Sequence, residues 1–209
     1  MKKRIALVDT DFVDHILSVT TNGEKLLELI FEEFGITPVV HPWVAEHEFV
    51  KTKMKKVLDS GLITTIPWKD ILKDNKDTRK IYETAICDIY ERLNHEELII
   101  DRPITEFRKA GESLGEIQSA ITAQMLNIPI LCSDDHGSKD IAPMLNSASF
   151  TLKVYNAFDV LNKTSQNPET AITYNDCDGI LSKCHEKNAK KYKELTKIIK
   201  GNYSTHLHK

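Results

Sequence analysis

Two short apolar segments of this chain, residues 5–8 and 128–132, each end at closely spaced acids. The acids are Asp9 and Asp11 after the first segment, and Asp134 and Asp135 after the second. Short apolar runs with polar boundaries are typical of strands that are covered on both faces in a parallel sheet. Because ligands of such sheets bind beyond the carboxyl ends of the strands, we expect these carboxylates to lie at a functional edge.

Glu46 is a further candidate acid, in a helix that the spacing of apolar residues predicts over residues 43–59. At about 100° per residue, Glu46 lies roughly 60° from the centre of the apolar stripe and Glu48 roughly 140° away. We therefore expect Glu46 at the edge of a buried face and Glu48 in solvent. A half-buried carboxylate needs a partner, which either a salt bridge or a metal ion would provide. The stripe consists of Trp43, His47, Val50, Met54 and Val57.

Glu116 is the last candidate acid, and it has a structural alternative. Ser113 and Glu116 have the spacing of a capping box, in which the two side chains bond backbone amides at the start of a helix. The helix that they would open leads directly into residues 128–132. A helix followed by a strand that ends in acids favours a strand–helix–strand unit.

If these acids meet at one edge of the sheet, their proximity predicts that they bind a cation. Several carboxylates at one sheet edge repel one another strongly in the low dielectric of a protein, and bound cations relieve that repulsion. Oxygen ligands without cysteine or paired histidine select hard ions such as Mg²⁺ or Mn²⁺, which proteins use mainly on phosphates. The acids therefore predict phosphoryl chemistry.

Composition limits the other function classes. The chain has 209 residues, 41% of them hydrophobic, which suits one sizeable core with an appendage rather than two full domains. The net charge of -3 does not indicate a nucleic-acid-binding protein overall, so such binding would need local basic patches. No segment reaches the ~20 apolar residues that cross a bilayer, and we expect a soluble, cytoplasmic protein.

The 4 cysteines fit no disulfide framework of a small secreted domain, and we expect reduced thiols. Cys177, Cys184 and His185 are close in sequence, but neither a CxxC pair nor a second histidine accompanies them at ligand spacing. The local pattern therefore does not predict a zinc site.

The alternation of strand and helix patterns predicts an α/β fold, a three-layer α/β/α sandwich with a mostly parallel central sheet. We assign residues 1–161 to this domain, with a helical insertion at about 60–101. Residues 162–209 are assigned to a polar connection and a basic amphipathic helix, predicted over residues 180–200. The lysines of that helix would either track a phosphate backbone or form an ordinary solvated face. They are Lys183, Lys187, Lys190 and Lys197.

Four acidic motifs, taken in order, resemble those of PIN-domain nucleases. They are Val8-Asp9-Thr10, Val44-Ala45-Glu46, Leu114-Gly115-Glu116 followed by Ser119-Ala120-Ile121, and Leu131-Cys132-Ser133-Asp134-Asp135. The resemblance covers about residues 4–161 and includes residues 157–161, which are similar to the segment that closes many PIN domains. It implies a PIN-like α/β/α fold and a metal-dependent ribonuclease, in the form of an endoribonuclease that hydrolyses RNA.

The resemblance also implies roles for individual residues. The catalytic metal-binding acids would be Asp9, Glu46, Glu116 and Asp135, with Asp134 as a neighbouring ligand and with Asp11 and Ser133 in support. The implied cofactor is Mg²⁺ or Mn²⁺ and the implied partner is RNA; a homodimer and an inhibitor or antitoxin protein stay open. Gln118 departs from the pattern, because some relatives carry an acid there, and this would weaken a second metal position.

Two other functions fit parts of the sequence. Residues 9–13 resemble the first motif of haloacid-dehalogenase-type phosphatases, with Asp9 as the nucleophile and Asp11 as the general acid and base. That alternative leaves Glu46 and Glu116 without a role. A catalytically silent PIN-like module that binds RNA or a partner protein is the other alternative.

Overall fold

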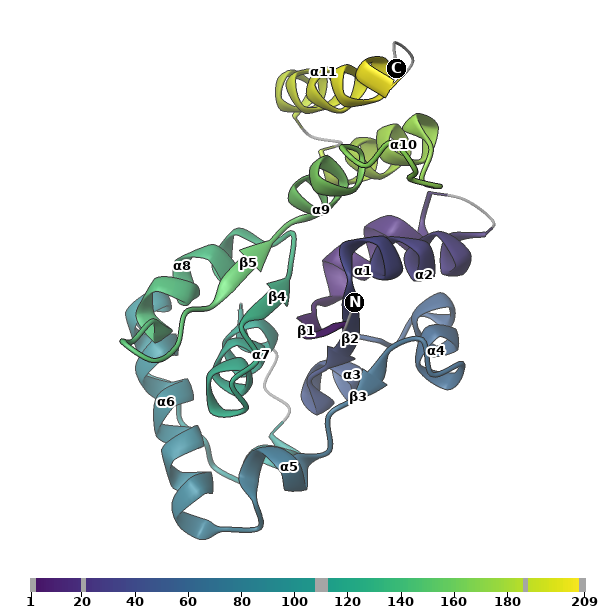
Figure 1. Cartoon of the computed structure of the whole chain (residues 1–209). Helices are drawn as coiled ribbons and strands as arrows, with labels where there is room; N and C mark the ends of the chain where they lie inside the picture. Colours follow the sequence, from purple (N-terminus) through teal and green to yellow (C-terminus); the bar gives the residue numbers. More distant parts are fainter. Residues whose placement is uncertain (1–2, 20–21, 108–112, 186–187, 207–209) are drawn as a thin grey trace.

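The computed structural model describes residues 3–19, 22–107, 113–185 and 188–206 (Figure 1). Over these ranges the chain forms an α/β fold around a five-stranded sheet in the order β3-β2-β1-β4-β5. The strands are β1 (Arg4–Val8), β2 (Ile36–Val40), β3 (Thr64–Thr65), β4 (Ile130–Cys132) and β5 (Lys153–Tyr155). The predicted fold class is confirmed, and every strand pair is parallel.

Helices flank this sheet in the manner of a three-layer sandwich. The α-helices are α1 (Thr10–Leu17), α2 (Gly23–Phe34), α3 (Pro42–His47), α4 (Thr52–Asp59), α5 (Trp68–Leu72), α6 (Lys76–Asn94), α7 (Leu114–Met125), α8 (His136–Leu145), α9 (Ala157–Thr164), α10 (Tyr174–Cys184) and α11 (Ala189–His206). On one face α2 packs against α1 and α9, and on the other α7 packs against α6 and α8 (Figure 1). None of the helices in the described ranges combines the length and apolar character needed to cross a bilayer.

The order of the strands reverses between β1 and β4. The chain steps from β1 outward through β2 to β3, then returns to the other side of β1 and steps outward through β4 to β5. Val8 pairs with Cys132 across this junction, and the Asp9 N–H donates to the Cys132 carbonyl at 2.9 Å. The ends of two strands are therefore adjacent at a switch point, the place where open α/β sheets bind their ligands.

Burial explains the apolar character of the two central strands. Ala6, Leu7 and Val8 of β1 are fully buried, and all three residues of β4 are buried as well. Helices cover both faces of these strands, so alternation with polar residues is not possible until the strands end. The polar side chains that follow are consequently gathered at the carboxyl edge.

The predicted helix over residues 43–59 is in fact two helices. α3 ends at His47 and α4 begins at Thr52. Between them Phe49 is 1% exposed, whereas Val50, which was assigned to the buried stripe, is 55% exposed. A continuous helix would direct Phe49 away from that stripe, so burial of this aromatic side chain requires the chain to leave the helix here.

The predicted C-terminal helix over residues 180–200 is also two helices. α10 ends at Cys184 and α11 begins at Ala189. The Asn188 side chain accepts a hydrogen bond from the Lys191 N–H at 3.1 Å, as the side chain at a helix N-cap does. Asn188 is therefore a start signal inside a segment that apolar spacing alone describes as continuous.

The region expected as a helical insertion, residues 60–101, also builds the sheet. It supplies the edge strand β3 before the helices α5 and α6. α6 packs against α7, and Tyr82 of α6 is fully buried. This region therefore shares the core of the strands that carry the acids.

Candidate functional site

Asp9 follows β1 directly and flanks the N-terminus of α1. It is only 3% exposed, and the Ser133 hydroxyl donates to Asp9 Oδ2 at 3.0 Å. Burial, followed by the negative charge of Glu48, raises the pKa of Asp9 to about 7. At neutral pH this carboxylate is therefore only partly ionised, and a positive charge close to it would favour the ionised form.

Ser133 connects Asp9 to the start of α8. The fully buried Ser133 hydroxyl donates to Asp9 while it accepts from Ser138 Oγ at 2.9 Å and from the Asp135 N–H at 3.2 Å. These bonds hold the Asp9 carboxylate in one orientation. The supporting role expected for Ser133 stays a prediction, and its hydrogen bond to Asp9 is the contact through which it would act.

Glu48 reaches the same edge from the end of α3. Thr10, the first residue of α1, donates from Oγ1 to Glu48 Oε2 at 2.5 Å. Gly115 at the start of α7 leaves room for this side chain, because a Cβ at Gly115 would collide with Glu48 Oε1. Burial, together with the charges of Asp11 and Asp135, raises the pKa of Glu48 despite the Thr10 hydrogen bond.

The sequence-based placement of Glu46 is wrong. Glu46 is exposed, whereas Glu48, expected in solvent, is half-buried. The angular argument assumed one long helix and counted Val50 in its buried stripe, but α3 ends at His47. Val44 of α3 is buried and precedes Glu48, the C-cap residue of this helix, by four residues, which places both on one side. That spacing is visible in the sequence but becomes informative only when the helix end is known.

Glu116 lies in the first turn of α7. The predicted capping box is absent, because Ser113 has a left-handed conformation with φ 64° and its side chain makes no capping hydrogen bond. Burial, then the charge of Asp9 and a hydrogen bond with Asp135, raise the pKa of Glu116 well above the usual range. Glu116 thus interacts with the acids of both central strands, and the capping-box explanation is wrong.

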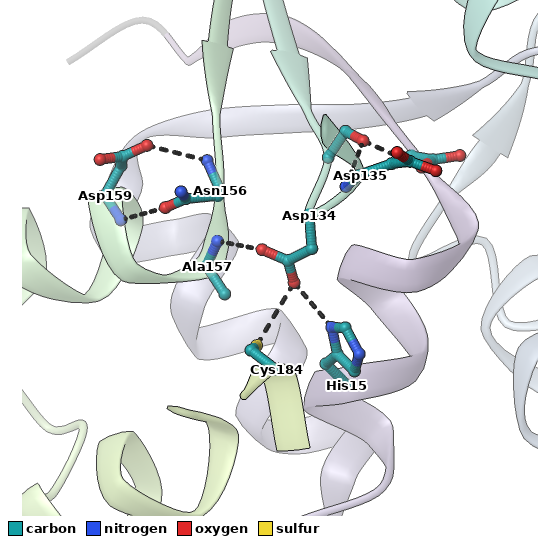
Figure 2. Close-up of polar contacts among 9 residues, drawn as sticks. His15, Asp134, Asp135, Asn156, Ala157, Asp159 and Cys184 are labelled. Carbon is teal, nitrogen blue, oxygen red and sulfur yellow. Dashed lines mark hydrogen bonds and ion pairs between the residues drawn. The ribbon is translucent and has the colours of Figure 1, made fainter. Parts of the chain in front are cut away.

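Asp134 and Asp135 are adjacent in sequence but point apart (Figure 2). Asp135 accepts from the Gly137 N–H at 2.8 Å as the N-cap of α8, and its charge acts on Glu116. Asp134 points the other way, toward His15, Ala157 and Cys184 (Figure 2). Successive side chains of an extended backbone face opposite ways, so only one of the two aspartates can join Asp9.

Asp134 has three partners on its own side of the strand end. Its Oδ1 accepts from the Ala157 N–H at 2.7 Å, and its Oδ2 lies 2.7 Å from His15 Nδ1 and 3.4 Å from Cys184 Sγ (Figure 2). Burial alone would raise the pKa of Asp134, but the hydrogen bonds from His15 and Ala157 outweigh it and lower that pKa. The ionised form of Asp134 is therefore stabilised by its own hydrogen-bond donors.

The acids that interact at the edge of β1 and β4 are Asp9, Glu48, Glu116 and Asp135. Within the described residues no Lys or Arg forms an ion pair with any of them. Asp11, expected in support, is exposed beside them. Among the described residues, the only three side chains whose potential metal-binding atoms all lie within 4.8 Å of one another are His15, Asp134 and Cys184. Because the oxygens of the four acids are not grouped this closely, binding of one shared ion would require the four carboxylates to move toward one another.

Gln118, where the pattern of PIN-domain nucleases suggested a further acid, belongs to a buried polar network. Its Oε1 accepts from the Tyr82 hydroxyl at 3.4 Å, and that hydroxyl lies 2.9 Å from His41 Nε2. Burial lowers the pKa of His41 to about 3, so this imidazole is neutral. An uncharged amide suits such surroundings, where a carboxylate would be costly.

A cavity of about 350 Å³ opens beside Asp134 at the carboxyl edge of the sheet. Its walls come from the ends of β4 and β5 and from α8, α9, α10 and α11. Three lysines supply positive charge to these walls: Lys139, Lys183 and Lys191. A local basic surface is therefore present in a chain whose overall charge is negative.

The predicted basic stripe is not continuous. Lys183 lines the cavity from α10, whereas Lys190 and Lys197 are exposed on α11. Lys187 lies outside the described residues. Because α10 and α11 are separate helices, the spacing of these lysines along the sequence does not place them on one face.

Comparison with known proteins adds no family to this geometry. A scan against protein-family models, a search of curated proteins and a search of solved structures each find no match. The resemblance to PIN-domain nucleases stays a prediction from the sequence motifs.

Proposed function

We propose that this protein is a metal-dependent ribonuclease that hydrolyses RNA phosphodiester bonds, with Mg²⁺ or Mn²⁺ held by Asp9, Glu48, Glu116 and Asp135. The observation that carries the proposal is the meeting of these four acids at the β1–β4 switch point without a Lys or Arg ion pair among the described residues. Burial of like charges opposes folding unless protons or cations neutralise them. A function that uses a cation explains why the chain places them there.

The donor set fits a hard divalent ion. All four side chains offer carboxylate oxygens, and Mg²⁺ and Mn²⁺ prefer oxygen ligands. Gly115 supports this assignment, because the space that a Cβ would fill there is occupied by the Glu48 carboxylate. The glycine thus keeps α7 close enough for Glu116 and Glu48 to approach a common ion.

The protein's own groups orient the ligands before any ion binds. Ser133 holds Asp9, Thr10 holds Glu48, and the Gly137 N–H holds Asp135. Hydrogen bonds of this kind commonly fix the direction in which metal ligands point. A bound Mg²⁺ or Mn²⁺ would supply a water of lowered pKa and would balance the charge that develops on the phosphate.

The basic cavity beside Asp134 favours a polyanionic substrate over a small phosphomonoester. Lys139, Lys183 and Lys191 come from three helices and line the cavity beside Asp134, the residue before the candidate ligand Asp135. A strand of RNA that reaches the acids would place neighbouring phosphates within range of such charges, and lysine–phosphate contacts supply most of non-specific nucleic-acid affinity.

The test uses end-labelled single-stranded RNA and p-nitrophenyl phosphate, each with Mn²⁺ or with EDTA. We expect RNA cleavage that EDTA abolishes and that Asp9→Asn abolishes. Turnover of p-nitrophenyl phosphate without RNA cleavage would instead support a dehalogenase-type phosphatase. Binding of RNA with no turnover of either substrate would support a silent module and contradict the proposal.

A further inference from the structure

We propose that His15, Asp134 and Cys184 form a second metal site, which takes Zn²⁺ and is separate from the carboxylate centre (Figure 2). The three residues lie far apart in the sequence, and the folded chain brings their donor atoms within 4.8 Å of one another. They come from α1, the end of β4 and the last residue of α10. The site therefore depends on the tertiary fold and has no local sequence signature.

The separations of the donor atoms suit a tetrahedral ion. Zinc binds nitrogen and oxygen at about 2.0 Å and sulfur at about 2.3 Å, which sets neighbouring donors roughly 3.3 to 3.6 Å apart. Cys184 Sγ already lies 3.4 Å from Asp134 Oδ2. His15 Nδ1 lies 2.7 Å from the same oxygen and would have to move outward by roughly half an ångström. A small rotation of the imidazole provides such a shift.

The chemical identity of the donors separates this site from the carboxylate centre. One nitrogen, one oxygen and one sulfur form a set that Zn²⁺ binds, whereas Mg²⁺ and Mn²⁺ prefer oxygen alone. Asp134 and Cys184 also line the cavity, together with His136 and His185. A water or one of these imidazoles would complete the tetrahedron.

The surrounding structure holds the ligands in place. The Ala157 N–H binds Asp134 Oδ1 and leaves Oδ2 to face His15 and Cys184. On α10, a Cβ at Gly179 would collide with the Val19 side chain, so this glycine lets α10 approach the chain that follows α1. Such outer contacts typically orient metal ligands.

A hydrogen-bonded group without a metal is the competing explanation for this arrangement. In that case the Cys184 thiol and the His15 ring donate to Asp134, as the distances allow. Zinc binding requires the thiolate, so the thiol proton must leave for solvent as the metal–sulfur bond forms. The two explanations therefore differ in whether Cys184 becomes a metal-bound thiolate.

The test is titration of the full chain with Co²⁺, a spectroscopic substitute for Zn²⁺. We expect thiolate-to-cobalt absorption in the near ultraviolet, saturating at one equivalent and lost when Zn²⁺ is added. Cys184→Ser should abolish this band. His15→Gln should weaken Co²⁺ binding by roughly tenfold or more. Cys87→Ser is the matched control, because Cys87 is also half-buried and donates to a carbonyl oxygen, that of Leu98.

Two results would overturn the proposal. One is the absence of the thiolate band from the wild-type protein in excess Co²⁺, and the other is its survival in Cys184→Ser. If circular dichroism shows that Cys184→Ser does not fold, the wild-type spectrum and the His15→Gln titration still decide. Asp9→Asn should leave the band unchanged, so a failure of the ribonuclease proposal is distinguishable from a failure of this one.

Discussion

Thr10 donates a 2.5 Å hydrogen bond to Glu48, a residue 38 positions further along the chain. The bond connects the first residue of α1 to the C-cap residue of α3. Because Thr10 is fixed at the start of α1, it directs the Glu48 carboxylate toward Asp9, whose pKa the Glu48 charge raises. The contact identifies Glu48 as the acid of the α3 segment that belongs to the candidate centre.

Glu48→Gln and Glu46→Gln form a matched pair two residues apart. We expect Glu48→Gln to reduce Mn²⁺-dependent RNA cleavage by at least ~100-fold, because the ion loses a ligand and shifts. Glu46→Gln removes an exposed carboxylate and should leave the rate near that of the wild type. Initial rates at saturating Mn²⁺ make the comparison, and equal losses in the two variants would contradict the assignment.

Gly115→Ala tests the close approach of α7 to Glu48. The added Cβ would collide with Glu48 Oε1, so we expect the carboxylate to be displaced and Mn²⁺-dependent cleavage to fall about tenfold or more. Gly201→Ala is the control, because a Cβ there meets nothing within 4 Å and alanine favours its helix, α11. Thermal melts of both variants separate loss of a ligand from loss of the fold.

In the metal-free protein, Asp9 should make a contribution to stability that decreases as the pH rises from about 4 to about 7. Asp9 ionises near its ordinary pKa of 3.8 when unfolded, but its pKa is about 7 in the folded chain. The folded state therefore retains a proton that the unfolded state has lost, so the contribution of Asp9 to stability is fully present below about pH 4 and is lost as the pH rises through 7. The expected loss at pH 7 is on the order of a few kcal/mol.

Urea denaturation in EDTA at several pH values measures this loss. Asp9→Asn should flatten the profile and raise the stability at pH 7, and Mn²⁺ should restore stability to the wild type. If the difference in stability between Asp9→Asn and the wild type does not increase between pH 4 and pH 7, the proposed burial of repelling acids is contradicted.

Charge reversal in the basic cavity should weaken RNA binding. We expect the double variant Lys139→Glu with Lys191→Glu to bind RNA more weakly and to show a shallower dependence on salt, because fewer phosphates are neutralised. Lys193→Glu with Lys197→Glu makes the same change of charge on exposed positions of α11 that do not line the cavity. Fluorescence anisotropy at several salt concentrations compares the pairs, and equal losses would exclude the cavity as a specific contact surface.

Local sequence patterns predicted the elements of the fold whose composition follows directly from burial. The apolar runs before Asp9 and Asp134 marked two central strands, because strands covered on both faces carry few polar residues. Both runs end at the sheet edge as expected. The parallel sheet follows from the alternation of strands with helices.

Tertiary contacts explain what the sequence did not reveal. Glu48 was missed because the helix ends to bury Phe49, and no glycine or proline marks that end. The capping box at Glu116 failed because Ser113 adopts a left-handed conformation that no sequence rule indicated. His15 could not be related to the C-terminal helices from spacing, since only packing brings them together.

The pairing of Val8 with Cys132 sets which aspartate faces which neighbour. A slip of β4 by one residue would exchange the two sides of the strand end. Asp134 would then face Asp9, and Asp135 would face His15 and Cys184. The alternation of the backbone thus gives the identical side chains of Asp134 and Asp135 different surroundings. The register of a three-residue strand determines which of the two acids faces each set of neighbours.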